Sequence, residues 1–192
     1  MRPIAATFVL SLAFALAGCQ TPLSPGREGG GVAGAGPQAS QGVQTRATGG
    51  GHYTIPGGID LEFAFSALLL PNGRAEGNFH HRGQADGALI DFTAEITCLS
   101  VDSVNHRAWL GGVITKNSST HPDFMTAVHQ VGHDIWFRVQ DNDAVEPSTT
   151  PDVTTIVGFE TLAIPSSQFY CDTMPWRTNN VWPVKGNLTV SP

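Results

Sequence analysis

The chain has 192 residues, of which 41% are hydrophobic and 14% are charged, and its formal net charge is −6 at pH 7. This length suits a single folded domain with one core. Because the sequence has no cluster or stripe of Lys and Arg, it argues against nucleic-acid binding and against direct attraction to an anionic membrane surface.

The N-terminus has the layout of a secretory signal peptide. Arg2 precedes an apolar run over residues 4–16, which is too short to span a bilayer comfortably, and small residues follow. The next four residues, Leu-Ala-Gly-Cys ending at Cys19, resemble the lipobox of bacterial lipoproteins. The resemblance implies that residues 1–18 are removed and that Cys19 carries the lipid. The alternative is an ordinary signal peptide followed by a chance cysteine.

The lipobox also bears on where the protein resides. It implies a protein anchored in the cell envelope. Gln20 follows the cysteine where an Asp would be a retention signal, so in a Gram-negative host the resemblance implies the outer membrane. Residues 19–51 are rich in Gly, Ala, Ser, Gln and Pro, a composition that predicts a flexible tether. The folded domain is expected over residues 52–192.

Within that domain, alternating apolar and polar residues predict seven or eight short strands. Asn72-Gly73 is a strong hairpin signal between the first two strands. A change of parity near Leu99 and Val101 suggests a bulge, and Gly111-Gly112 suggests close backbone approach. The predicted strands cover residues 59–69, 74–81, 88–101, 107–115, 134–140, 153–158 and 184–190. We therefore expect one all-β antiparallel domain, a small barrel, with a two-sheet sandwich as the alternative.

Two cysteines remain after the proposed lipid site. Cys98 and Cys171 form an even pair in a chain expected outside the cytosol, which favours a disulfide that closes a loop of roughly 70 residues. Two buried free thiols are the alternative. Neither cysteine has a nearby Cys or His at metal-ligand spacing.

The segment HQVGH, from His129 to His133, differs by one residue from the zinc-protease motif H-E-x-x-H. Gln130 replaces the glutamate that would act as the base, and Gly132 disfavours the helix that the motif requires. The segment also leads directly into a predicted strand. We therefore expect loop or strand-edge histidines here rather than a zinc site.

An acidic stretch between two predicted strands supplies oxygen-bearing side chains close together. Calcium prefers such hard ligands. The order of residues does not match an EF-hand, and Asp and Asn also favour turns for local reasons. A calcium site and a solvated acidic turn both remain open. The candidate ligands are Asp141, Asp143, Glu146 and Asp152.

Four tryptophans are the candidate binding residues. Trp109 and Trp136 fall on strand faces opposite the aliphatic residues, whereas Trp176 and Trp182 lie in a Pro-rich C-terminal segment. Exposed aromatic rings suit carbohydrate or protein partners. The alternative is that these rings cover a sheet face or cap a barrel end.

The stretches ITCLSVD, AWLGG, IWFRVQDND and PVKGNLTV resemble an uncharacterised all-β domain of secreted bacterial proteins, over about Gly51 to Pro192. The resemblance implies a single-disulfide β-domain and brings no catalytic residue with it. We therefore expect a membrane-anchored lipoprotein with a non-catalytic β-domain in a binding or envelope-structural role. The alternative is a small-barrel enzyme or carrier for a small apolar ligand, with His81 and Arg138 lining its interior.

Overall fold

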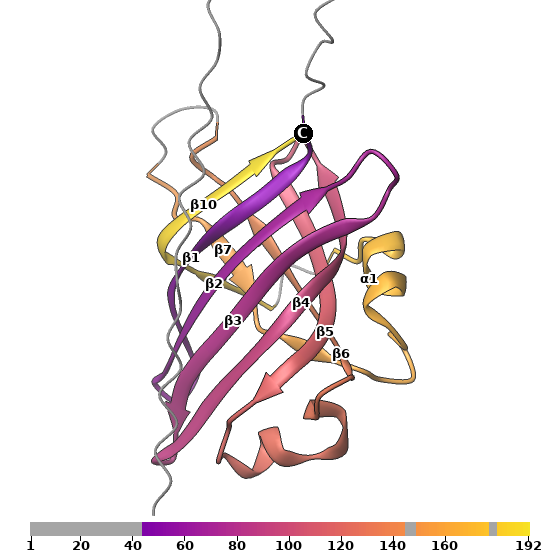
Figure 1. Ribbon diagram of the computed structural model, residues 1–192. Helices are drawn as coiled ribbons and strands as arrows, with labels where there is room; N and C mark the ends of the chain where they lie inside the picture. Colours follow the sequence, from indigo (N-terminus) through magenta and orange to yellow (C-terminus); the bar gives the residue numbers. More distant parts are fainter. Residues whose placement is uncertain (1–43, 145–148, 177–179) are drawn as a thin grey trace, which may run out of the picture. The chain divides into compact units, whose positions relative to one another are not determined.

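The computed structural model describes residues 44–144, 149–176 and 180–192, which form one ten-stranded sheet curved into a nearly closed barrel (Figure 1). The predicted all-β barrel is confirmed, and the two-sheet sandwich is wrong. The strands are β1 (Arg46–Ile55), β2 (Ile59–Leu69), β3 (Ala75–Ala85), β4 (Ala88–Asp102), β5 (Arg107–Asn117), β6 (Asp134–Gln140), β7 (Val153–Thr155), β8 (Gly158–Phe159), β9 (Val181–Pro183) and β10 (Lys185–Ser191).

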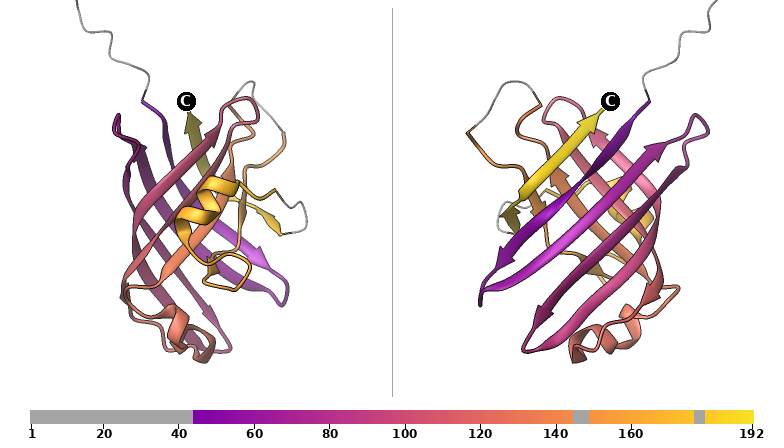
Figure 2. Two further views of the ribbon diagram at one scale, coloured as in Figure 1. Left: turned by 90° about the vertical axis from the view of Figure 1, so that its right-hand side faces the viewer. Right: turned by 60° about the vertical axis from the view of Figure 1, so that its left-hand side comes forward.

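The strands follow the order β10-β1-β2-β3-β4-β5-β6-β7-β9, and β8 pairs with β6 beside this path. Strands β1 to β6 are a meander of antiparallel neighbours. Two 3-10 turns, η1 (Pro122–Met125) and η2 (Ala127–His129), lie at one end of the barrel, and the helix α1 (Ser167–Thr173) packs on its outer wall (Figures 1 and 2).

The sequence did not predict the first strand, β1, because the first predicted strand, over residues 59–69, is β2. We placed residues 46–51 in the tether, but they are part of β1, which pairs with β2 on one side and with β10 on the other. The apolar alternation was hidden because glycine occupies inward positions 49 and 51, between Ala47 and Tyr53. Hydrogen bonds to both neighbours hold this glycine-rich strand, so the domain begins at Arg46 rather than His52.

The inward faces of the strands fill the barrel with aromatic rings. Phe137 from β6 lies at the centre, with its ring centroid 4.5 Å from that of Phe79 and 5.3 Å from that of Phe65. Phe92 continues the stack towards the end covered by η1, where Phe124 packs against it at 6.1 Å. The interior is therefore a packed hydrophobic core.

A register shift in β4 determines which residues reach that core. The shift lies between Ile96 and Cys98, a few residues before the bulge that the sequence suggested near Leu99. Ile96 and Leu99 are both buried in the core, whereas Cys98 turns to the outer wall. The bulge thus turns Cys98 outward, where it can be bonded to α1.

Two aspartates close the barrel where the two edges of its curved sheet meet. Asp141 follows β6 and Asp152 precedes β7, and both are buried. Their Oδ2 atoms accept hydrogen bonds from the backbone N–H groups of Leu188 and Val190 in β10, with Asp152 to Leu188 at 2.8 Å and Asp141 to Val190 at 3.1 Å. These N–H groups point away from β1, so the carboxylates replace the neighbouring strand that β10 lacks on that side.

Substituting Asp152 should therefore weaken the barrel. In Asp152→Asn the side-chain amide keeps one acceptor oxygen, but its NH2 group replaces the other oxygen and faces a backbone N–H group. We therefore expect a loss of about 1–3 kcal/mol in the free energy of unfolding. Chemical denaturation measures this, with exposed Asp123→Asn as the matched control. Equal stability of the two variants would contradict a closing role for Asp152.

Candidate functional site

Two places in the barrel carry most of the side chains that the sequence singled out for an enzyme or a binding site. One is the interior around His81, and the other is the outer wall beside α1. In β6 the apolar residues face inward and Trp136 and Arg138 face outward, as the alternation predicted. His81 and Arg138 therefore lie on opposite sides of the barrel wall, so the interior set suggested for an enzyme is not brought together.

His81 is held in the interior as a neutral group. Its side chain is 1% exposed, and its Nε2 lies 3.0 Å from the hydroxyl oxygen of Tyr53. Burial is the main cause that lowers the pKa of His81 to about 3, and the neighbouring His80 lowers it further. Among the described residues its Nδ1 has no hydrogen-bond partner. The rings of Phe79 and Phe92 pack beside it.

The outer wall is organised by the attachment of α1. The disulfide between Cys98 of β4 and Cys171 of α1 confirms the predicted pairing. Gly111 of β5 lies directly beneath, and a Cβ at this position would come within 2.7 Å of the Ser167 Cβ and 2.8 Å of the Cys98 Sγ. The predicted close approach at Gly111 is thus the contact between the helix and the sheet. The Ser167 hydroxyl also donates to Asp134.

The helix covers two of the four candidate tryptophans. Trp109 and Trp136 are only 3% and 6% exposed, and Tyr170 of α1 stacks on Trp136 with a centroid distance of 5.8 Å. The indole N–H of Trp109 donates to the Pro175 carbonyl at 3.0 Å. The prediction that these two rings are exposed binding platforms is wrong, because α1 covers them. A helix of seven residues is too short for its periodicity to be seen in the sequence, so this cover was not predicted.

The other two tryptophans have different surroundings. Trp182 of β9 is half-buried against the core. Trp176 is 37% exposed, but two guanidinium groups lie on its ring, with the Cζ of Arg107 3.4 Å and the Cζ of Arg138 3.9 Å from the centroid. These are cation–π contacts. The exposed indole of Trp176 is thus already engaged by arginine.

Beside α1 the outer wall is hollowed into a cleft of about 440 Å³. Its floor comes from β6, β7 and β8, and its sides come from α1 and the segments that flank it. Trp136, Arg138 and Tyr170 lie in it, and burial raises the pKa of Tyr170 to about 12. The other lining residues are Thr155, Ile156, Gly158, Thr161, Ala163, Ile164, Phe169, Thr173, Pro175 and Asn180.

Gly158 shapes the floor of this cleft. A Cβ at Gly158 would lie 2.2 Å from the indole Nε1 of Trp136, so only glycine lets the ring lie against β8. Trp136 and Arg138 are the cleft residues that the sequence alone singled out, and the strand predicted over residues 153–158 is divided into β7 and β8. Tyr170 and Phe169 belong to the unpredicted helix, and Thr155 and Gly158 come from two strands of three and two residues.

The acidic stretch has a structural role where the structure describes it. Besides binding β10, Asp152 accepts from the N–H of Asn142 at 2.8 Å, and Asp141 accepts from the N–H of Asp143 at 3.1 Å. Glu146 lies outside the described residues. Within them, no three His, Cys, Asp or Glu side chains gather as a metal site. The carboxylates of Asp141 and Asp152 thus bind backbone N–H groups, and the calcium site stays a prediction.

The HQVGH segment is a loop at the end of the barrel. His129 ends η2, and its Nδ1 lies 2.7 Å from the Thr126 hydroxyl. His133 precedes β6, and its Nδ1 lies 3.1 Å from Glu160 Oε2. The two histidines thus have separate partners, in agreement with the expectation of loop histidines.

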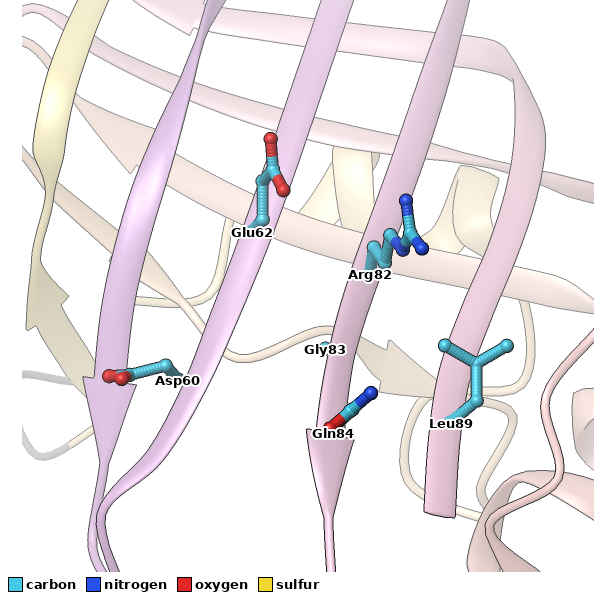
Figure 3. A pocket seen from close by; sticks show the side chains of 6 residues that line it. All are labelled: Asp60, Glu62, Arg82, Gly83, Gln84 and Leu89. Atoms are coloured by element: carbon cyan, nitrogen blue, oxygen red, sulfur yellow. The ribbon is translucent and has the colours of Figure 1, made fainter. Parts of the chain in front are cut away.

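A second groove crosses the outer faces of β2, β3 and β4, and Figure 3 shows its side chains. Asp60 and Glu62 come from β2, and Arg82 is the register partner of Glu62 on β3. Both signs of charge are present here. This groove resembles an ordinary polar strand surface more than a built binding site.

Fold and site define a small antiparallel β-barrel with a disulfide-held helix on its outer wall. Comparison with protein-family models, curated proteins and solved structures found no match for this chain. Within the described residues, no helix has the length and apolar character needed to cross a membrane.

The buried His81 makes stability depend on pH. The unfolded chain binds a proton near the ordinary pKa of 6.5 and the folded chain only near pH 3, so stability is lost as the pH falls through this range, at up to about 1.4 kcal/mol per pH unit. Denaturation of the wild type and of a Tyr53→Phe/His81→Phe double variant should show this slope only in the wild type. Equal slopes would mean that His81 titrates normally in a wet interior.

Proposed function

We propose that this chain is a lipid-anchored protein of the cell envelope whose barrel domain is a non-catalytic binding module. The observation that carries the binding role is the cleft beside α1. A volume of about 440 Å³ lies within the range of small-molecule sites, and apolar and aromatic side chains line it together with a few polar groups. Because aromatic side chains fill the barrel, the proposal assigns binding to the outer wall rather than to the interior.

An exposed apolar rim supports the same place. Seven large hydrophobic residues are exposed among the described residues, and four of them lie between positions 162 and 176, on or beside α1. They are Leu162, Phe169, Met174 and Trp176. Phe169 lines the cleft, and the other three residues adjoin lining residues in the sequence. Exposed apolar side chains of this kind are typical of a surface that binds another molecule.

The anchor is supported by the sequence alone. Lipid attached at Cys19 would hold the domain at a membrane, and in a Gram-negative host Gln20 favours the outer membrane. A carbohydrate or protein partner was expected from exposed tryptophans. The covered rings of Trp109 and Trp136 now favour a ligand that enters the cleft instead.

The anchor is tested by labelling growing bacterial cells that make the full chain with radioactive palmitate. We expect label in the wild-type protein and none in Cys19→Ala, since the acyl group would be carried on that thiol. Cys98→Ala serves as a matched cysteine control and should keep the label. Label retained by Cys19→Ala would refute the lipidation.

The binding role is tested by calorimetric titration of residues 20–192, made without the lipid, with naphthalene-2-carboxamide as a neutral aromatic probe. Ala163 is exposed at the side of the cleft, so Ala163→Trp should fill the cleft without disturbing the core. We expect saturable binding by the wild type and loss of binding in Ala163→Trp. Binding that survives in the variant, or is absent from both proteins, would contradict this site.

A further inference from the structure

The apolar rim gathers exposed hydrophobic side chains in one region of the outer wall. Leu162 is fully exposed, and Phe169 and Met174 are exposed as well. The left view of Figure 2 turns this region towards the viewer, with α1 and the loop that leads into it side by side. Apolar side chains scattered singly over a surface are ordinary, but a group of them marks a place where another surface is bound.

The side chains of the rim are presented by rigid elements. Leu162 lies in a turn that two hydrogen bonds close, from the Thr161 N–H to the Ile164 carbonyl and from the Ile164 N–H to the Thr161 hydroxyl, both at 3.0 Å. Phe169 belongs to α1, which Cys171 bonds to β4. Because these elements are already ordered, a partner that covers them costs little further conformational entropy.

Charged side chains are scarce along the segment that carries the rim. Asp172 is the only residue of positions 161–176 that is charged at pH 7, and its carboxylate accepts from the Gln168 amide at 2.8 Å. Phe169 and Thr173 are one position further along the helix, which rotates them by about 100°, and they line the cleft. The rim itself is uncharged, so an apolar partner can cover it without burying an ionised group.

Trp176 adds an amphipathic ring to the rim. It is 37% exposed, and Arg107 and Arg138 hold it by cation–π contacts. Tryptophan is enriched where a bilayer meets water, because its ring is apolar and its N–H is polar. Leucine and phenylalanine beside tryptophan form the side of interfacial helices that enters the membrane. The composition of the rim thus matches the boundary of a bilayer.

The proposed lipid anchor would put a bilayer within reach of this wall. Lipid at Cys19 would leave residues 20–45 between the membrane and the start of β1. A chain of this composition and length spans roughly 25–30 Å. The eleven-residue strands β2 and β3 are roughly 36 Å long, so the tether lets more than one face of the barrel meet the membrane. It also keeps the barrel at a high local concentration beside the bilayer, where a weak contact is sufficient.

We propose that the apolar rim docks on the bilayer that holds the lipid anchor, with Leu162 and Phe169 inserted among the lipids and Trp176 at the level of the headgroups. The inference rests on the proposed anchor and adds the orientation of the barrel at the membrane. The contact is apolar, because a net charge of −6 opposes attraction to anionic lipid. In this orientation the cleft beside α1 lies at the membrane surface.

The test attaches residues 19–192, which include the whole described barrel, to vesicles of phosphatidylcholine through a maleimide lipid. Cys98 and Cys171 are joined in the disulfide, so the thiol of Cys19 is the one that reacts. Phosphatidylcholine brominated in its acyl chains quenches the fluorescence of tryptophan at the bilayer. We expect quenching in the wild type and its loss in Trp176→Phe. Added salt should leave the quenching unchanged, since apolar insertion is not screened.

Two matched variants locate the contact. Leu162→Asp/Phe169→Asp should lose most of the quenching, because a carboxylate within a bilayer is costly. Val104→Asp/Val131→Asp adds the same charge at two valines that are 85% and 61% exposed outside the rim, and it should be quenched like the wild type. If the first double variant fails to fold, Leu162→Asp alone decides the question, because that side chain is fully exposed.

The chemical attachment separates this inference from the proposed anchor, because it holds the protein at the vesicle whether or not cells acylate Cys19. An unquenched wild type would overturn the docking, while palmitate label in cells would still support the anchor. Quenching that persists in Leu162→Asp/Phe169→Asp would place the contact on another face and overturn the inference. Dimers of residues 20–192 that sediment in solution and that this variant abolishes would assign the rim to a second copy of the chain, which would overturn it as well.

Discussion

The closure of the barrel by Asp141 and Asp152 is the interaction on which the rest of the structure depends. An open sheet would leave N–H groups of β10 without partners at its edge, and buried unpaired N–H groups are costly. The two carboxylates accept from Leu188 and Val190 and also from the loop that carries them. Each aspartate thus joins β10 to the turn after β6, where strand pairing ends.

A closed barrel of this size has its interior filled by its own side chains. The stack from Phe65 through Phe137 and Phe79 to Phe92 occupies the centre, and Phe124 packs on it from the end of the barrel. His81 is accommodated only as a neutral group bonded to Tyr53. The interior therefore stabilises the fold.

The two sides of that wall are built differently. Over β2, β3 and β4 it carries alternating polar side chains that face water. Over β5 and β6 it carries Trp109, Trp136 and Arg138, which are covered by α1 and by the residues that follow it. The bulge at β4 turns Cys98 outward, Gly111 lets the helix approach, and the disulfide fixes it there. The cleft exists because the helix covers this wall only in part.

Much of the fold could be predicted from the sequence, because local patterns encode it. Alternation located β2 to β6 and β10, Asn72-Gly73 indicated the first hairpin, and the cysteine count indicated the disulfide. These signals depend on neighbours in the chain, so they survive without the tertiary structure. The proposed lipid anchor rests on the same kind of local pattern.

The tertiary structure alone determined the contacts between segments that are far apart in the sequence. Residues 46–51 form a strand because β2 and β10 pair with them on either side, and this glycine-rich stretch has no apolar alternation that would predict it. In the sequence, Asp141 and Asp152 resembled cation ligands, whereas in the structure their carboxylates accept hydrogen bonds from the backbone N–H groups of β10. Trp136 is covered by a helix that follows it by some thirty residues. Periodicity reports which residues share a face, and only the folded chain determines what covers that face.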